Sequence, residues 1–244
     1  MKVVFLRTCL TVFLSLVSIN SSANLIKPGM MDDFEDGTTR SWVKGPKASS
    51  GQSPKNLSLM DESNRYLQVE SYGAGEKDRD VASRLVFFNE KQWAGDYSEI
   101  GAISMKLKAE SATEEFLFMR LAFYDDKASG SYTRFVSRNP FVLSTDGKWH
   151  DALFNLEEDD FSRFRGERDW SDVLQNVTQL RILSNKDEAR AWGVDKIAAS
   201  LSVDDITALP KTSITTVPLP SGLILLLSAL YGLFAARPGR KLIK

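Results

Sequence analysis

Acidic side chains gather in two stretches that lie far apart in the sequence, and together they could bind a cation. The first stretch covers residues 32–36, and the second holds two consecutive aspartates. Calcium takes several hard oxygen ligands, carboxylates and main-chain carbonyls among them. The side chains that could supply such ligands are Asp33, Glu35, Asp36, Asp204 and Asp205. The same carboxylates could instead lie at the solvated ends of strands without binding a metal. The sequence leaves both interpretations open.

The residues for enzymatic catalysis are scarce. His150 is the only histidine, and it lies in the strand-like stretch KWHDALF, where a structural role is favoured over that of a catalytic base. Cys9 is the only cysteine. A catalytic zinc would therefore have to be held by one histidine and carboxylates, which makes such a site implausible. The acidic run LEEDDF, residues 156–161, could supply a glycosidase pair but is more typical of a solvated loop. We predict a non-enzymatic protein, with a secreted polysaccharide-active enzyme as the alternative.

Aromatic side chains in expected loops favour sugar binding. Exposed rings stack on the apolar faces of sugars, while polar side chains hydrogen-bond the hydroxyl groups. The candidate rings are Trp93, Trp170, Trp192 and Tyr132. Core packing is the competing interpretation for each of them, and we expect it for Trp42 and Trp149, which lie in strand-like contexts. A purely structural protein that binds no sugar is therefore a second alternative.

The elements that must position these residues are predominantly strands. Ile103, Met105 and Leu107 alternate with polar residues, which predicts a strand with one buried and one solvated face. The stretch FLFMRLAF is apolar on both faces, which predicts a central strand. The expected strands cover residues 65–71, 83–88, 100–109, 115–124, 132–137, 148–156, 178–184 and 200–208, and one short helix is expected near DWSDVLQNV. Many strands with almost no helix predict an all-β antiparallel sandwich, with the jelly roll as its favoured version.

The N-terminus has the layout of a secretory signal peptide. Lys2 and Arg7 precede an apolar stretch, and small residues follow it, with cleavage expected after Ala23. Hydrophobic residues make up 43% of the 244-residue chain and charged residues 26%, which is typical of a folded domain. Between the signal peptide and the basic C-terminal end, 25 basic residues face 32 acidic ones. This negative balance disfavours nucleic acid as a partner.

The C-terminal end combines a proline motif, an apolar run and basic residues. The motif is Val217, Pro218, Leu219 and Pro220. Residues 221–236 are strongly apolar, close to the length needed to cross a bilayer. The basic residues that follow are Arg237, Arg240, Lys241 and Lys244. They would stay on the cytoplasmic side, so the folded domain would lie across the membrane.

This layout resembles the PEP-CTERM sorting signal in its VPLPA variant, with Ser221 where that variant has alanine. The resemblance implies an exosortase-like membrane protease as a partner, an inner-membrane intermediate and release at the surface or into the exopolysaccharide matrix of a Gram-negative bacterium. A plain C-terminal membrane anchor is the alternative. We expect a signal peptide at 1–23, a folded domain at 24–209, a linker at 210–216 and a sorting signal at 217–244.

Two stretches of the folded domain resemble the first and last strands of carbohydrate-binding-module-like jelly rolls. They are DDFEDGTTRSW, from residue 32, and SVDDITA, from residue 202. Phrases such as NEKQWAGDYSEIGAISMKL also resemble the exported domains that precede PEP-CTERM tails. The resemblance implies that the two chain ends lie side by side, that a structural Ca²⁺ sits between them with Glu35 and Asp204 as matching ligands, and that an exopolysaccharide is a partner.

Overall fold

The computed structural model of the chain describes residues 24–44, 57–61, 64–73, 84–126, 132–187 and 196–211. The chain divides into two compact units, Met1–Pro210 and Lys211–Lys244. The predicted signal peptide, the predicted sorting signal at 217–244 and Trp192 lie outside the described residues. Within the described ranges, no helix combines the length and the apolar character needed to cross a bilayer.

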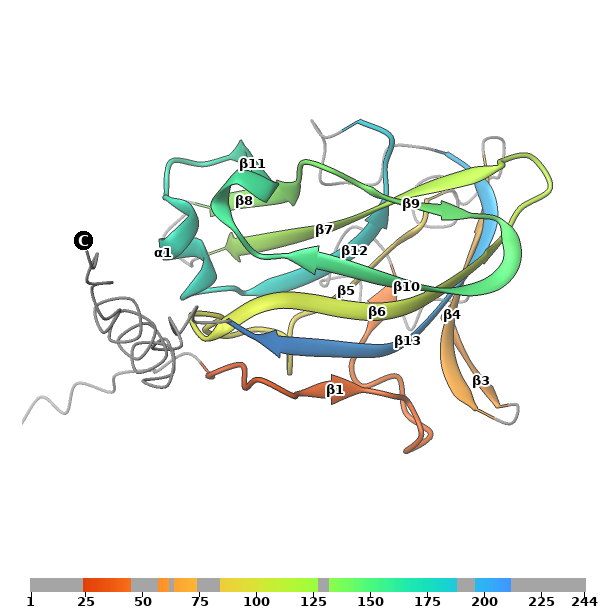
Figure 1. Cartoon of the computed structure of the whole chain (residues 1–244), viewed down its shortest axis with the longest axis horizontal. Helices are drawn as coiled ribbons and strands as arrows, with labels where there is room; N and C mark the ends of the chain where they lie inside the picture. The colour runs from red at the N-terminus through yellow and green to blue at the C-terminus, as the bar shows by residue number, and fades with distance from the viewer. Residues whose placement is uncertain are drawn as a thin grey trace, which may run out of the picture. The chain divides into compact units, whose positions relative to one another are not determined.

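The described strands form two antiparallel sheets that face each other (Figure 1). The six-stranded sheet runs in the order β10 (Asp146–Asn155), β6 (Ile100–Glu110), β13 (Ala198–Pro210), β4 (Arg65–Tyr72) and β3 (Leu57–Asp61), with β1 (Met31–Asp32) on β13. The seven-stranded sheet runs in the order β11 (Phe161–Arg165), β8 (Tyr132–Ser137), β7 (Phe116–Asp126), β12 (Gln179–Ser184), β5 (Val86–Asn89) and β2 (Val43–Lys44), with β9 (Phe141–Ser144) on β7. The helical elements are η2 (Glu158–Asp160) and α1 (Trp170–Leu174). The predicted all-β antiparallel sandwich is confirmed.

Sequence periodicity accounts for the two most informative strands. In β6, Ile103, Met105 and Leu107 are buried against the other sheet, whereas Lys106 faces solvent, as the alternation predicts. The stretch FLFMRLAF forms β7, which lies inside the seven-stranded sheet between β8 and β12. From Met119 to Asp125 the side chains of β7 are buried on both faces of the sheet.

The two ends of the folded domain lie side by side, as the sequence resemblance implied. In the β1–β13 pair, Met31 lies opposite Thr207 and Asp32 lies opposite Ile206. Asp32 is 1% exposed, and its carboxylate accepts hydrogen bonds from the indole nitrogens of Trp42 and Trp93, each at 2.7 Å. Gln92 Nε2 donates a third bond at 2.7 Å. This carboxylate therefore joins the first strand to the aromatic core.

A buried lysine in β2 predicts a pH dependence of stability. Lys44 is 2% exposed, and its ammonium group donates to the main-chain oxygen of Glu70. Burial lowers the pKa of Lys44 to about 8, although the charge of Glu70 opposes this shift. Between this value and the ordinary 10.5, the unfolded chain holds a proton that the folded chain has lost, so stability rises with pH in that window.

We therefore expect Lys44→Met to raise the free energy of unfolding at pH 7 by about 1–2 kcal/mol, because it removes a buried charge. The increase in stability above pH 8 should also be absent from this variant. Urea unfolding of the full chain across this pH range measures both effects, and Lys91→Met, at an exposed position, serves as the control. A Lys44→Met variant that is less stable than the wild type at pH 7 would contradict the account.

Candidate functional site

The outer face of the seven-stranded sheet carries an unusual set of side chains. Along β7, Leu117, Met119, Leu121 and Phe123 belong to the core between the sheets. Because successive side chains of a strand point to opposite faces, Arg120, Ala122, Tyr124 and Asp126 point away from the core. Outer faces of sheets usually carry small or solvated polar residues, so a buried arginine and a buried tyrosine here require an explanation.

The strand register places similar side chains from the neighbouring strands in one row. Arg134 on β8 lies directly opposite Tyr124, and Gln179 on β12 lies opposite Tyr124 on its other side. Arg165 on β11 lies opposite Arg134. The row thus crosses four strands, which at the usual spacing between strands spans about 14 Å. Tyr132 lies next to this row, opposite Asp126.

Guanidinium groups lie over the tyrosine rings of this surface. The Cζ atoms of Arg134 and Arg181 are 4.2 Å and 4.0 Å from the centroid of the Tyr124 ring. The Cζ atoms of Arg165 and Arg134 are 4.0 Å and 4.8 Å from the centroid of the Tyr132 ring. Such cation–π contacts hold the planar groups in fixed positions. We call these five residues, Tyr124, Tyr132, Arg134, Arg165 and Arg181, the arginine–tyrosine face.

This face has a covered end and an open end. Tyr124 is fully buried and Arg181 is 3% exposed, whereas Tyr132 is half-buried and Arg165 is exposed. Asp126 is also exposed, and its carboxylate pairs with Arg134 at 3.2 Å. The open end therefore offers a ring, the Arg165 guanidinium group and a carboxylate to a ligand.

The segment after β11 is held close to β8, which positions Arg165. Gly166 has a φ of +86°, and a Cβ at this position would collide with the Thr133 side chain and the carbonyl group of Tyr132. Arg168 then forms an ion pair with the buried Asp125, and its main-chain N–H donates to Thr133 Oγ1 at 3.3 Å. Only glycine allows this close approach, and it brings Arg165 over the Tyr132 ring.

Burial also determines the protonation state of Tyr124, at the covered end of the face. It raises the pKa of the Tyr124 hydroxyl, an effect that the nearby Arg181 and Arg134 partly oppose. Burial likewise lowers the pKa of Arg181 below its ordinary value. Because a tyrosine with a raised pKa stays protonated at neutral pH, Tyr124 remains a neutral hydrogen-bond donor and acceptor.

The residues of this face suit a ligand rich in hydroxyl groups. A guanidinium group presents five N–H donors in a rigid plane, whereas carboxylate and amide oxygens accept hydrogen bonds. Aromatic rings add apolar surface beside these polar groups. Sugars combine the same two features, hydroxyl groups at the rim and apolar ring faces, so the arrangement matches them chemically.

The structure separates the four candidate rings of the sequence. Tyr132 lies at the open end of the arginine–tyrosine face. Trp93 is fully buried, with its indole nitrogen bound to Asp32, and therefore presents no ring to a sugar. Trp170 is 5% exposed and stacks on Phe161, with 4.4 Å between the ring centroids. The predictions for Trp93 and Trp170 are corrected because both indoles pack inward, Trp93 from a turn and Trp170 from the first residue of α1. Trp192 lies outside the described residues.

Trp42 and Trp149 were both expected in the core, and the structure confirms only the first. Trp42 is 1% exposed, whereas Trp149 is 39% exposed on the outer face of the six-stranded sheet. There it makes an edge contact with Tyr66, with 5.3 Å between the ring centroids, and Lys108 lies over its ring. The strand-like context was correct, but β10 turns this side chain outward.

Sequence reasoning missed the arginines of the candidate site. No prediction was made for these side chains, which are Arg134, Arg165 and Arg181, because a single arginine in a strand is ordinary. The sequence held one indication of the site in the spacing of its residues. Tyr132 and Arg134 are two residues apart in β8 and therefore point to the same face of the sheet. Assembling the complete row also required the pairing of β8 with β7 and β11, which a single sequence does not contain.

The carboxylates predicted to bind calcium are bound to protein groups. Asp204 accepts hydrogen bonds from Asn64 Nδ2 at 2.6 Å and from the main-chain N–H of Asp205. Asp205 pairs with Lys106 at 2.8 Å, and Glu35 accepts from the main-chain N–H of Arg65. Asp33 accepts from the main-chain N–H of Glu35 at 3.3 Å, and Asp36 pairs with Arg40 at 2.8 Å.

No group of three histidine, cysteine or acidic residues suited to a metal occurs among the described residues. Calcium binding therefore stays a prediction of the sequence, and the arrangement of these carboxylates does not support it.

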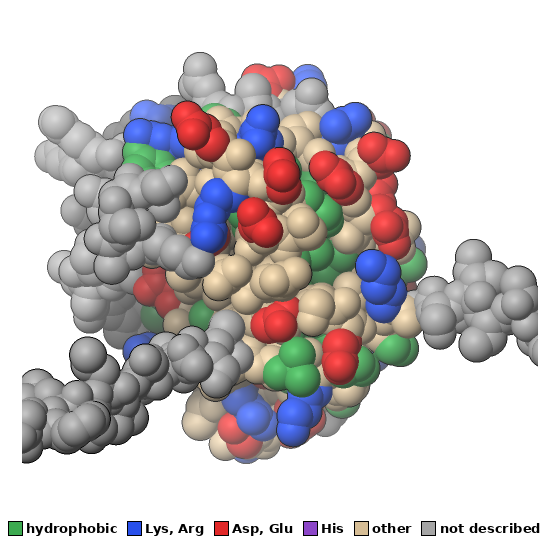
Figure 2. All heavy atoms as spheres, turned by 90° about the vertical axis from the view of Figure 1, so that its left-hand side faces the viewer, with side chains coloured by type: hydrophobic (Ala, Val, Ile, Leu, Met, Phe, Trp, Pro, Cys, Tyr) green, Lys and Arg blue, Asp and Glu red, His purple; other side chains and the backbone are tan. Residues whose placement is uncertain are grey.

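Charged side chains of both signs are interspersed over the end of the sandwich that Figure 2 shows. Hydrophobic side chains form only small groups on this side of the molecule. Nucleic-acid-binding domains typically carry their lysines and arginines clustered on one face. The surface in Figure 2 does not have that character.

Comparisons with known proteins find likenesses to solved structures at low sequence identity. No protein-family model matches it, and no curated protein matches it. The family 11 carbohydrate-binding module of Clostridium thermocellum aligns at a TM-score of 0.47 and 14% identity, over 76% of this chain and 96% of the module. A module of family 28 specific for non-crystalline cellulose aligns at 0.47 and 13%, over 78% and 97%. The xylan-binding domain CBM22-1 of Paenibacillus barcinonensis Xyn10C aligns at 0.45 and 13%, over 78% and 100%. At these TM-scores the likenesses assign no family and no ligand to the chain.

Proposed function

We propose that this chain is an exported, non-enzymatic glycan-binding protein and that its sugar site is the arginine–tyrosine face. One observation carries the proposal: the partly exposed Tyr132 ring lies beside Arg134 and Arg165, next to the exposed carboxylate of Asp126. Ring surface, fixed N–H donors and an acceptor thus occur together at one open end of a rigid sheet. A rigid sheet suits a binding site because little conformational freedom is lost when a ligand binds.

In this proposal each residue has a definite part in binding. The exposed Arg165 guanidinium group donates hydrogen bonds to sugar hydroxyl and ring oxygens, Asp126 accepts from hydroxyl groups, and the buried Arg134 holds Asp126 in place. The ring of Tyr132 contributes apolar contact, while the covered Tyr124 and Arg181 keep the neighbouring side chains in place.

The cellular setting is proposed from the sequence alone. The signal peptide at 1–23 supports export, and the motif at 217–220 with its apolar and basic continuation supports recognition by an exosortase-like protease. The protein would then act at the cell surface or in the exopolysaccharide matrix, with that polysaccharide as its ligand. The jelly-roll version of the sandwich belongs to the same proposal.

The proposal predicts that Arg165→Ala weakens glycan binding about tenfold, because a charge-assisted hydrogen bond to the ligand and a support of the Tyr132 ring are lost. The full chain is tested by affinity electrophoresis against mixed-linkage β-glucan, xylan, hydroxyethylcellulose and the exopolysaccharide of the host. Arg163→Ala is the matched control, since Arg163 lies on the same strand and its guanidinium donates to the carbonyl groups of Glu167 and Arg168. Equal effects of both substitutions, no retardation on any polysaccharide, or hydrolysis of one of them would contradict the proposal.

A further inference from the structure

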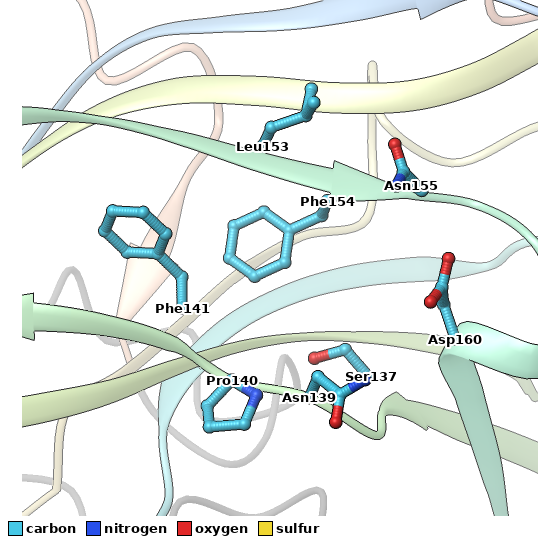
Figure 3. A pocket seen from close by; sticks show the side chains of 8 residues that line it. All are labelled: Ser137, Asn139, Pro140, Phe141, Leu153, Phe154, Asn155 and Asp160. Atoms are coloured by element: carbon cyan, nitrogen blue, oxygen red, sulfur yellow. The ribbon is translucent and has the colours of Figure 1, made fainter.

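A hollow opens at one edge of the sandwich, away from the open end of the arginine–tyrosine face. It has a volume of about 220 Å³ and is lined by Ser137, Asn139, Pro140, Phe141, Leu153, Phe154, Asn155 and Asp160 (Figure 3). Tyr132 and Ser137 are the two ends of β8, so the two sites are about 16 Å apart along the strand. We call this hollow the edge pocket.

The edge pocket forms where the chain passes from one sheet to the other. β9 pairs with β7 in the seven-stranded sheet, and Phe141 lies opposite Met119. The chain then turns and enters the six-stranded sheet as β10, where Phe154 lies opposite Ile103. Two phenylalanines from different sheets thus flank one opening, and η2 with Asp160 borders it after β10 (Figure 3).

One wall of the pocket is held rigidly by Arg120. The Nη1 atom of Arg120 donates to the carbonyl oxygens of Ser137 and Arg138, both at 2.6 Å. Its Nε and Nη2 atoms donate to the carbonyl oxygens of Asn185 and Lys186. The main-chain N–H of Arg138 donates to the carbonyl oxygen of Asp160 at 2.7 Å, which ties η2 to the end of β8. The pocket is therefore part of the fixed framework of the fold.

The pocket has two kinds of lining. Phe141 and Phe154 supply apolar ring surface, and Leu153 lies at the rim (Figure 3). Asn139 and Asn155 supply amide groups, and Asp160 supplies a carboxylate. Within the described part of the chain, none of these three side chains has a hydrogen-bond or ion-pair partner, so their donors and acceptors are open to a ligand.

We infer that the edge pocket binds one neutral pyranose ring, as a second sugar site independent of the arginine–tyrosine face. Its volume equals that of about seven water molecules, which suits a ligand of one ring rather than an extended chain. The phenylalanine rings face the apolar side of the sugar, while the amides and the carboxylate bind its hydroxyl groups. Asp160 favours a neutral sugar over a uronic acid, because two carboxylates in contact repel each other.

The test uses methyl β-D-glucopyranoside as the probe and glucuronic acid as the charged comparison. For a ligand of about a dozen non-hydrogen atoms we expect a Kd of about 1 mM. Nuclear magnetic resonance of the full chain should show the glucoside shifting the side-chain amide signals of Asn139 and Asn155. Asp160→Asn should weaken binding about fivefold, because a charged acceptor becomes a neutral group. Asp159→Asn, next to it and outside the pocket lining, should leave binding unchanged.

Any of three results would overturn the inference. The first is the absence of amide shifts at Asn139 and Asn155 at probe concentrations far above 1 mM. The second is an equal effect of Asp160→Asn and Asp159→Asn on these shifts, and the third is the same set of shifts with glucuronic acid. Polysaccharide retardation that depends on Arg165 is measured separately, so a failure of the edge pocket leaves the proposed function standing, and the reverse also holds.

Discussion

Asp32→Asn is expected to lower the free energy of unfolding by about 2–4 kcal/mol, because it leaves buried N–H donors without an acceptor. In the wild type, one carboxylate oxygen accepts from the Trp42 and Trp93 indoles and the other accepts from Gln92. Asparagine keeps only one oxygen, so its NH₂ group must face at least one of these donors. Burial raises the pKa of the Asp32 carboxyl, although the hydrogen bonds from Trp93, Trp42 and Gln92 oppose this shift.

Asp33→Asn is the matched control for this prediction. Asp33 is the next residue, it is more exposed, and its Oδ1 accepts one long bond from the main-chain N–H of Glu35. We expect its substitution to change stability by less than about 0.5 kcal/mol. Urea unfolding of the full chain, followed by tryptophan fluorescence, measures both variants. Equal stability of Asp32→Asn and Asp33→Asn would show that the indole–carboxylate cluster does not hold the first strand in place.

Tyr132→Ala is expected to weaken glycan binding about 30-fold, which corresponds to about 2 kcal/mol. The substitution removes the only partly exposed ring of the arginine–tyrosine face and releases the Arg165 guanidinium that lies over it. Both the apolar contact to the sugar and the fixed position of a donor are lost together. Isothermal titration calorimetry with the best ligand from the polysaccharide panel measures the change in affinity.

Tyr72→Ala controls for the general loss of a surface tyrosine. Tyr72 is 47% exposed on β4, in the other sheet, and its hydroxyl donates to Glu70 at 3.2 Å. Its removal should leave glycan affinity within about twofold of the wild type. If Tyr72→Ala weakened binding as much as Tyr132→Ala did, the site would have to be moved to the six-stranded sheet.

The fold was largely predictable from the sequence because its strongest strands obey the period of two. β8 matched its predicted range, residues 132–137, and β4, β6, β7, β10, β12 and β13 were predicted within two residues at either end. β11 was missed, since Phe161–Arg165 follows an acidic run and carries charged residues at alternating positions. β9 was missed because it is only four residues long and follows Pro140.

The candidate site was far less predictable, since it depends on which strands are neighbours. Tyr132 was identified from its residue type and its place near a loop. Arg165 comes from β11, a strand that was not predicted, and only the close approach at Gly166 brings it to Tyr132. Trp93 shows the opposite case: its loop setting predicted exposure, but Asp32, 61 residues earlier, binds its indole in the core.

The most direct test of the glycan site is a crystal structure of the protein with an oligosaccharide derived from the polysaccharide that it binds best. The account predicts the sugar at the open end of the arginine–tyrosine face, with a ring against Tyr132 and hydroxyl groups within hydrogen-bond distance of Arg165 and Asp126. An oligosaccharide bound instead on the six-stranded sheet beside Trp149, with the arginine–tyrosine face empty, would contradict it.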